Sequence, residues 1–190
     1  EAALGLVFGI LLGVITAILV DNFTLIRKGI YPLIIISQTI PTVAIAPLLV
    51  LWFGYGILPK IILIILVTFF PIAIGLIGGF SAVDKDMIIL MKSMGANKLE
   101  IFYHVKFPAA LGEFFSGLKI AVAYSVVGAV ISEWLGGFSG LGVYMTRVKK
   151  SYSYDKMFAV ILLISGISLL LMWITKLVQK RCMPWEKEKE

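Results

Sequence analysis

The sequence predicts an all-α membrane protein, a polytopic bundle of transmembrane helices. Of its 190 residues, 60% are hydrophobic and only 15% are charged, whereas about a quarter of the residues in a typical soluble domain are charged. The apolar residues also gather in long runs, and a run of roughly 20 residues is enough for a helix to cross a bilayer core of about 30 Å. Composition and run length together exclude a soluble fold.

Five apolar runs have the length of a membrane span. They cover residues 2–20, 29–59, 61–83, 114–135 and 157–175. We expect helices because backbone polar groups must be paired in lipid, and the alternating pattern of membrane strands is absent. The chain enters its first run directly after Glu1 and has no basic segment before it, so this run is not a signal peptide. We expect that a further helix precedes it and is missing here.

The basic residues predict which side of the membrane each connection faces. Eleven of the 17 Lys and Arg residues fall in regions 27–28, 85–106 and 176–189, which a five-helix zigzag places on one side. Lys and Arg accumulate in cytoplasmic connections, so we assign this side to the cytoplasm. Lys60 and the four basic residues at 147–156 fall on the opposite side, contrary to this assignment. Residues 1–180 form the transmembrane domain, with a cytoplasmic loop at 81–112 and a polar cytoplasmic tail at 181–190.

The net charge and the scarce reactive residues exclude several functions. The net charge is +6, and the Lys and Arg residues lie mostly between the apolar runs and in the tail. Membrane topology explains this placement, so we expect lipid and not nucleic acid as a partner. A single cysteine, Cys182, and a single histidine, His104, cannot build a disulfide, a cysteine cluster or a histidine metal site. We therefore expect no catalytic centre and no cofactor or metal bound by this chain, which argues against a membrane-embedded enzyme.

Residues 81–112 are mixed and charged between two apolar runs, and they predict two short helices joined by a turn. Asp84 or Asp86 can cap the first helix, and Gly95 can end it with a left-handed backbone. Asn97 and Glu100 have the spacing of a capping box at the start of the second helix. We expect Pro108 to prevent a smooth helical run into the fourth span.

Both short helices carry apolar faces that need a cover outside the membrane. The first face consists of Met87, Leu90, Met91 and Met94, and the second of Ile101, Phe102 and Val105. The cover is either the end of the bundle itself or a cytoplasmic partner, and methionine is suited to an interface that repacks during a cycle.

Polar residues within spans are candidates for a solute pathway, because such groups face protein or water and not lipid. The candidates are Ser37, Gln38, Thr39, Thr68, Tyr124 and Ser125. Gln38 is the strongest, since Ser and Thr can bond their own helix backbone. Pro41, Pro47 and Pro71 interrupt the backbone hydrogen bonding and are candidate hinges, although prolines also occur in ordinary membrane helices.

A glycine-rich turn follows the fourth span. We expect Glu133 to bond the backbone of this turn, "GGFSGLG". The turn lacks the Gly-Lys-Ser/Thr ending of a phosphate-binding loop and follows no strand, so we expect no nucleotide there. In the third span, Gly75, Gly78 and Gly79 would permit close helix contact.

The loop resembles the cytoplasmic "EAA" loop of ABC-transporter permeases. Gly95, Ala96, Val105, Phe107 and Pro108 stand at the positions of that pattern, whereas Ile89, Leu90 and Met91 replace its Glu-Ala-Ala. The stretches "QTIPTVAIAPLLVLWFGYG" at 38–56 and "SEWLGGFSGLGVYM" at 132–145 are similar to the permease subgroup that serves nitrate, sulfonate, taurine and thiamine-precursor uptake.

The resemblance implies a type I importer permease in the bacterial inner membrane, with six spans in the subgroup. Two permease subunits, here as a homodimer, would form the pathway for a small polar or anionic organic solute. An extracytoplasmic binding protein would deliver it. Separate ATPase subunits would hold ATP and Mg and receive the loop. The alternative is a self-contained channel or secondary transporter; no charged residue in the span interiors suggests ion coupling, and no inverted repeat is evident.

Overall fold

The computed structural model describes residues 1–185, and this part is helical with no strand. The elements are α1 (Ala2–Asn22), α2 (Thr24–Ser37), α3 (Thr42–Phe53), α4 (Ile57–Ser81), α5 (Lys85–Ser93), α6 (Lys98–Ile101), a π-helical segment (Phe102–Lys106), α7 (Phe107–Gly136), α8 (Leu141–Lys150) and α9 (Tyr154–Cys182). The tail predicted at 181–190 begins within α9, and residues 186–190 of it lie outside the described part.

Four helical stretches are long and apolar enough to cross a membrane: α1, α4, the continuous stretch Lys98–Gly136, and α9. The second predicted span is not one helix. It is divided into α2 and α3, which are bent by 98° at residues 38–41 and together can make a fifth, broken span. Pro41 starts α3 and lacks the amide that would continue the hydrogen bonding. Arg27 and Lys28, expected in a connection, lie inside α2.

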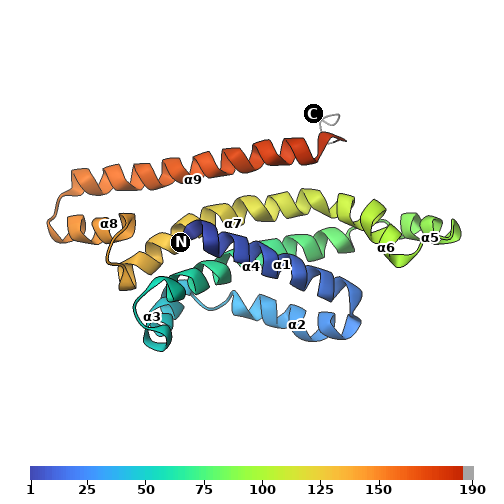
Figure 1. Cartoon of the computed structure of the whole chain (residues 1–190), viewed down its shortest axis with the longest axis horizontal. Coiled ribbons are helices and arrows are strands. Elements are labelled where there is room, and N and C mark those ends of the chain that lie inside the picture. The colour runs from blue at the N-terminus through green and yellow to red at the C-terminus, as the bar shows by residue number, and fades with distance from the viewer. Residues whose placement is uncertain (186–190) are drawn as a thin grey trace.

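The centre of the bundle is α4, which packs between α1 and α7 (Figure 1). On α1, the glycines at 5, 9 and 13 lie directly on the side chains of Ile64, Thr68 and Ile72. A similarly close contact joins α4 and α7, where Gly79 meets the backbone of Ala110. Small residues of this kind let membrane helices approach closely. The close contact predicted at Gly75 and Gly79 is confirmed, whereas Gly78 faces open space.

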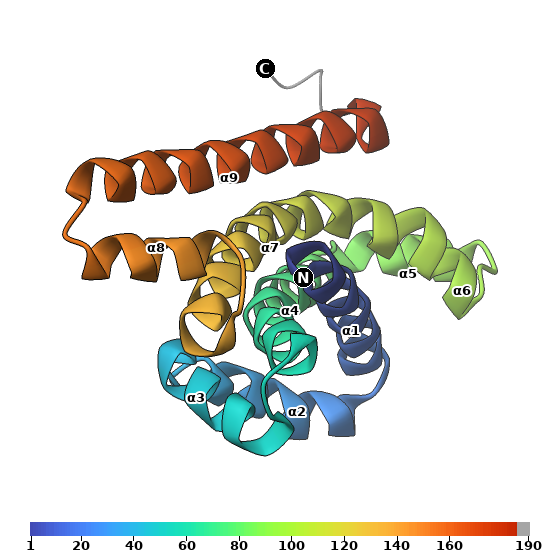
Figure 2. The same ribbon diagram turned by 60° about the vertical axis from the view of Figure 1, so that its left-hand side comes forward.

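Helix α9 and the α2–α3 pair lie on opposite sides of this centre. Figures 1 and 2 show α9 on one side and the α2–α3 pair on the other. Helix α9 is scarcely covered by the rest of the protein, since only 6% of an apolar stretch of 18 residues in it is buried. Helix α8, which the sequence analysis did not predict, connects α7 to α9.

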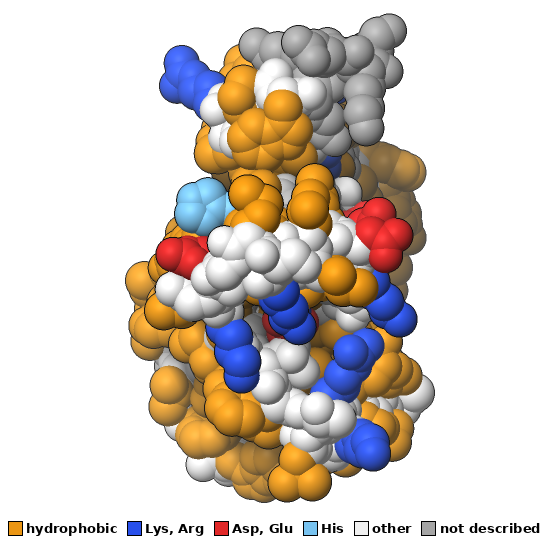
Figure 3. Space-filling model, turned by 90° about the vertical axis from the view of Figure 1, so that its right-hand side faces the viewer, with side chains coloured by type: hydrophobic (Ala, Val, Ile, Leu, Met, Phe, Trp, Pro, Cys, Tyr) orange, Lys and Arg blue, Asp and Glu red, His pale blue; other side chains and the backbone are white. Residues whose placement is uncertain are grey.

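Helices α5 and α6 project from one end of the bundle, beside the connection between α1 and α2 (Figure 1). Figure 3 faces this end and shows Lys and Arg side chains gathered on it. Apolar, membrane-length helices therefore end in a charged cap from which a short helical segment protrudes.

Candidate coupling segment and transport cavity

Residues next to α5 in the sequence cap both of its ends. The Asp84 carboxylate accepts a hydrogen bond of 2.9 Å from the Asp86 amide at the start. At the end, the Gly95 amide bonds the Lys92 carbonyl and the Ala96 amide bonds the Met91 carbonyl, both at 3.0 Å. These two bonds make a Schellman motif, in which Gly95 has φ of +85°. A side chain at Gly95 would meet only open space, so backbone conformation is the reason for glycine here.

The second short helix begins as the sequence predicts. The Asn97 side chain accepts from the Glu100 amide at 2.9 Å, and the Glu100 carboxylate accepts from the Asn97 amide at 2.7 Å. Together they form the predicted capping box. The capping box therefore defines where α6 begins after the turn at Gly95.

The expectation that Pro108 interrupts the helix is wrong. The chain is helical from Lys98 to Gly136, and Pro108 lies in the first turn of α7. The residues before it adopt a π-helical turn, in which the Phe107 amide bonds the Phe102 carbonyl five residues back. This wider turn accommodates a residue that has no amide and whose ring would clash with a tighter turn. The second short helix is thus joined directly to a membrane-spanning helix.

The apolar faces of the two short helices have different surroundings. Helix α5 has no buried residue, and Met87, Leu90 and Met94 are 57%, 60% and 75% exposed. In contrast, Ile101 and Val105 are buried. Of the two covers considered for the second face, the bundle itself is the one observed, because the Phe102 ring lies 5.6 Å from the Phe80 ring of α4. The first face remains uncovered by the described part of the chain.

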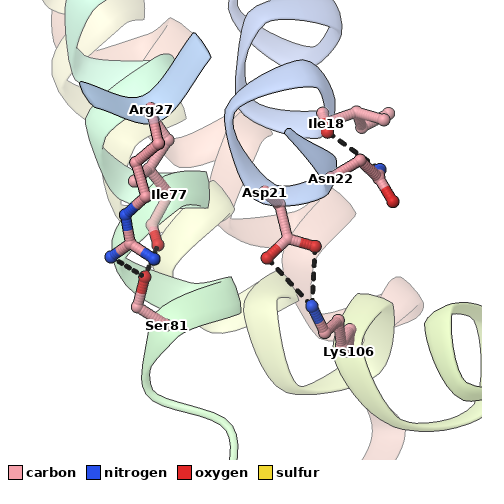
Figure 4. Close-up of polar contacts among 7 residues, drawn as sticks. All are labelled: Ile18, Asp21, Asn22, Arg27, Ile77, Ser81 and Lys106. Carbon is pink, nitrogen blue, oxygen red and sulfur yellow. Dashed lines mark hydrogen bonds and ion pairs between the residues drawn. The ribbon is translucent and has the colours of Figure 1, made fainter. Parts of the chain in front are cut away.

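Polar contacts tie the base of this segment to the bundle (Figure 4). The Lys106 ammonium lies 2.7 and 2.9 Å from the two carboxylate oxygens of Asp21, at the end of α1. Nearby, the Arg27 guanidinium of α2 donates to the Ser81 hydroxyl of α4 at 3.2 Å. The sequence analysis missed both contacts. An acidic residue directly after a wholly apolar span was the available signal for Asp21.

A cavity of about 720 Å³ lies between the α2–α3 break and the facing sides of α4 and α7. It brings together three of the predicted pathway residues, Ser37, Gln38 and Tyr124, and the candidate hinge Pro41. Leu66 and Phe69 of α4 contribute to its apolar wall. A cavity of this size can hold a small organic molecule.

The other predicted pathway residues do not line this cavity. Thr68 and Ser125 are fully buried between helices, and their hydroxyls donate to the carbonyls of Ile64 and Val122 at 2.8 Å each. Thr39 is exposed at the break and bonds the Ile36 carbonyl. All three hydroxyls therefore donate a hydrogen bond to a backbone carbonyl close to them in the sequence. Of the other candidate hinges, Pro47 lies inside α3 and Pro71 inside α4.

The role predicted for Glu133 is confirmed. Its carboxylate accepts a hydrogen bond of 2.6 Å from the Gly142 amide. At Gly140, φ is +128° and a side chain would collide with the same carboxylate. The glycines of this turn therefore bring the backbone onto Glu133 and hold the end of α7 against α8.

The sequence profile of binding-protein-dependent transport system inner membrane components matches residues 9–183. The chain belongs to this family. It is a multi-pass permease subunit of the ABC-importer type and not an enzyme. Among the described residues, no group of three or more His, Cys, Asp or Glu could hold a metal ion.

Two curated relatives align with nearly the whole of this chain. The formylaminopyrimidine transport permease protein of Halalkalibacterium halodurans is 36% identical over 98% of this chain and 74% of its own. The taurine transport system permease protein of Escherichia coli is 30% identical over 97% of this chain and 67% of its own.

The fold matches that of solved ABC importers. An amino acid ABC transporter crystallised with histidines has a TM-score of 0.70 at 17% identity, over 96% of this chain and 87% of that chain. The MetNI methionine transporter also has a TM-score of 0.70, at 18% identity, over 96% of this chain and 88% of that chain. At this identity the likeness supports the fold alone.

The contact between Asp21 and Lys106 should stabilise the permease. In a double-mutant cycle of Asp21→Asn and Lys106→Met, we expect a coupling energy of about 1 kcal/mol, because both side chains are largely shielded from water. The free energy of unfolding in mixed detergent micelles measures it. Asp86→Asn combined with Lys106→Met is the control, and these two changes should be additive. Additivity of the Asp21 and Lys106 changes would contradict the prediction.

Proposed function

We propose that this permease couples to a separate ATPase through the 81–112 loop, with α5 as the docking helix. The observation that carries the proposal is the uncovered apolar face of α5 at the charged end of the bundle. A helix that stood in water alone would not retain such a face, and large exposed apolar patches mark interaction sites. Met87, Met91 and Met94 suit a groove whose shape changes during ATP turnover.

The connection from α5 into the membrane supports the transmission of force. Ile101, Phe102 and Val105 are packed on the bundle, and the π-helical turn continues into α7. A displacement of α5 would therefore act on α7 and, through Lys106 and Asp21, on α1. In this proposal Gly95, Ala96, Asn97, Glu100 and Pro108 contribute to coupling by maintaining the geometry of the segment.

The proposed topology places α5, α6 and the end of α9 in the cytoplasm of a bacterial inner membrane. The basic residues concentrated at this end support that orientation. ATP and Mg would be bound by the partner ATPase, and a second copy of the permease would close the pathway on its open side. An extracytoplasmic binding protein would deliver the solute.

The cavity at the α2–α3 break is the proposed pathway, lined by Ser37, Gln38 and Tyr124. Pro41 at the break, with Pro47 and Pro71 inside helices, would allow these elements to bend between two arrangements. The solute is a small organic molecule. The relatives are named for transport of formylaminopyrimidine, riboflavin, taurine and aliphatic sulfonates, which include both heterocycles and sulfonates.

Copurification and transport test the proposal together. The affinity-tagged permease, expressed with its neighbouring genes, should bring down an ATPase subunit. Reconstituted vesicles in which α5 faces the lumen should accumulate solute from outside only when the lumen contains ATP. A purified permease that moves solute without nucleotide or partner would be a self-contained channel or secondary transporter and would contradict the proposal.

A further inference from the structure

A cluster of basic residues lies at the end of the molecule opposite α5 and α6. Arg147, Lys149 and Lys150 occupy the last turn of α8, and Lys156 lies in the first turn of α9. Figures 1 and 2 show this α8–α9 corner at the far end of the bundle from the coupling segment. All four side chains, which we call the corner cations, are exposed.

The corner cations have almost no charge compensation within residues 1–185. None of them forms an ion pair there, and their side chains make a single, long hydrogen bond, 3.5 Å from the Arg147 guanidinium to the Phe138 carbonyl. Asp155 is the only acidic residue between positions 134 and 185. The dipole of α8 favours positive charge at this end, but it amounts to only about half a charge. The corner therefore keeps a surplus of positive charge that an external anion can neutralise.

This surplus lies at the level where lipid headgroups begin. The apolar run of α9 starts at Met157, directly after Lys156, and α9 is scarcely buried by the rest of the chain. Lipid therefore has access to α9 from its first turns onward, where Phe158 and Leu162 are exposed. On a lipid-facing helix, the boundary between charged and apolar residues marks the level of the headgroups.

The turn between α8 and α9 holds a tyrosine at some cost in backbone energy. The Ser153 amide bonds the Val148 carbonyl and the Tyr152 amide bonds the Lys149 carbonyl, which makes a Schellman motif. Tyr152 takes the position where glycine is usual, with φ of +55°, and no other non-glycine residue in 1–185 has a positive φ. Its side chain is 76% exposed, so packing within the described chain does not explain the choice of residue.

A tyrosine at this position suits a membrane interface. The Tyr152 ring lies 6.5 Å from the ring of Tyr154, which is also exposed. Tyrosine gathers at the level of the headgroups, because its ring is apolar and its hydroxyl can bond water. The corner therefore combines aromatic anchors with attraction for negative charge.

We propose that the α8–α9 corner binds the headgroup of an anionic phospholipid, with the corner cations around its phosphate and Tyr152 and Tyr154 as anchors beside it. Lipid is favoured over an acidic protein surface because the cluster borders a lipid-exposed helix. The Glu133 carboxylate accepts from the Gly142 amide at 2.6 Å and ties α8 to the end of α7. A lipid bound at the corner therefore also holds the end of α7. The inference does not depend on the proposed coupling to an ATPase.

Lipid titration of the full permease tests the inference. In dodecyl maltoside micelles, native mass spectrometry should show that phosphatidylglycerol binds more tightly than phosphatidylcholine. Each Lys or Arg beside anionic headgroups contributes about fivefold to the affinity. The combined change of Lys149→Gln, Lys150→Gln and Lys156→Gln should therefore weaken the tightest binding of phosphatidylglycerol by more than about tenfold.

The matched control removes three charges from the opposite end of α9. Lys176→Gln, Lys180→Gln and Arg181→Gln together should leave the tightest phosphatidylglycerol in place, because these exposed residues lie far from the corner. An equal or larger loss in the control, or equal affinity for the two lipids, would overturn the inference. So would a corner variant that keeps phosphatidylglycerol but loses affinity for an extracytoplasmic binding protein, since that result would assign the corner to a protein partner.

Tyr152→Gly separates anchoring from folding. Glycine adopts a positive φ without strain, so the Tm of this variant in phosphatidylcholine nanodiscs should be unchanged or raised. The further rise in Tm on replacing phosphatidylcholine with phosphatidylglycerol should be smaller than in the unmodified chain, because the interfacial ring is lost. An undiminished effect of phosphatidylglycerol would contradict the anchoring role of Tyr152.

Discussion

Replacing Leu90 with aspartate should separate the permease from its ATPase. Leu90 lies on the uncovered face of α5, between Met87 and Met94, and a carboxylate there would be buried in the docking groove without a partner. An unpaired charge in an interface costs about 3 kcal/mol or more, which corresponds to more than a hundredfold in the dissociation constant. Copurification and the dissociation constant in detergent measure the effect. The fold should be unaffected, since α5 buries none of its residues.

Lys92→Asp is the control for this experiment. Lys92 is exposed on the opposite side of the same helix, and its replacement changes charge by more than Leu90→Asp does. Binding of the ATPase should change by less than tenfold. If Leu90→Asp copurifies with the ATPase as well as the unmodified permease does, the uncovered face of α5 is not the docking surface.

Replacing Gly117 with alanine should destabilise the bundle. The added methyl group would fall on the carbonyl oxygen of Pro71, where α7 crosses α4. This neighbour is backbone, so the two helices must separate, and overpacking of this kind costs about 2 kcal/mol. The apparent Tm followed by circular dichroism in detergent should fall by several degrees.

Gly78→Ala provides the matched comparison for Gly117→Ala. Gly78 also lies inside a membrane-length helix, but a methyl group there meets no atom within 4 Å. Its Tm should be unchanged or slightly raised, because alanine favours the helix over glycine. Equal Tm values for Gly117→Ala and the unmodified protein would mean that α4 and α7 do not pack as closely as described.

The sequence predicted the coupling segment more accurately than the cavity. The bonds of Asp84, Gly95, Asn97 and Glu100 join residues two to five apart, so local chemistry defines them. In contrast, the pathway candidates were chosen by polarity alone. Polarity could not separate Gln38 and Tyr124, which face the cavity, from Thr68 and Ser125, which bond their own helices.

Two errors had the same physical origin. Pro108 was expected to prevent a smooth helical run into the fourth span, but the backbone adopts a π-helical turn that continues into α7. The second apolar run was expected to be one span, and it is bent by 98°. A proline removes a hydrogen bond in either case. Whether the chain then widens a turn or breaks depends on the packing around it, which spacing along the sequence does not reveal.

By itself, the sequence determined that this chain is a membrane helix bundle with a capped helical segment between two spans, because long apolar runs and short-range capping bonds need no knowledge of distant residues. Only the tertiary structure decided which faces are covered. It buried Ile101 and Val105 while leaving α5 without a buried residue, joined Asp21 to Lys106 across 85 positions, and opened a cavity at the α2–α3 break. These features depend on how helices far apart in the chain pack against one another.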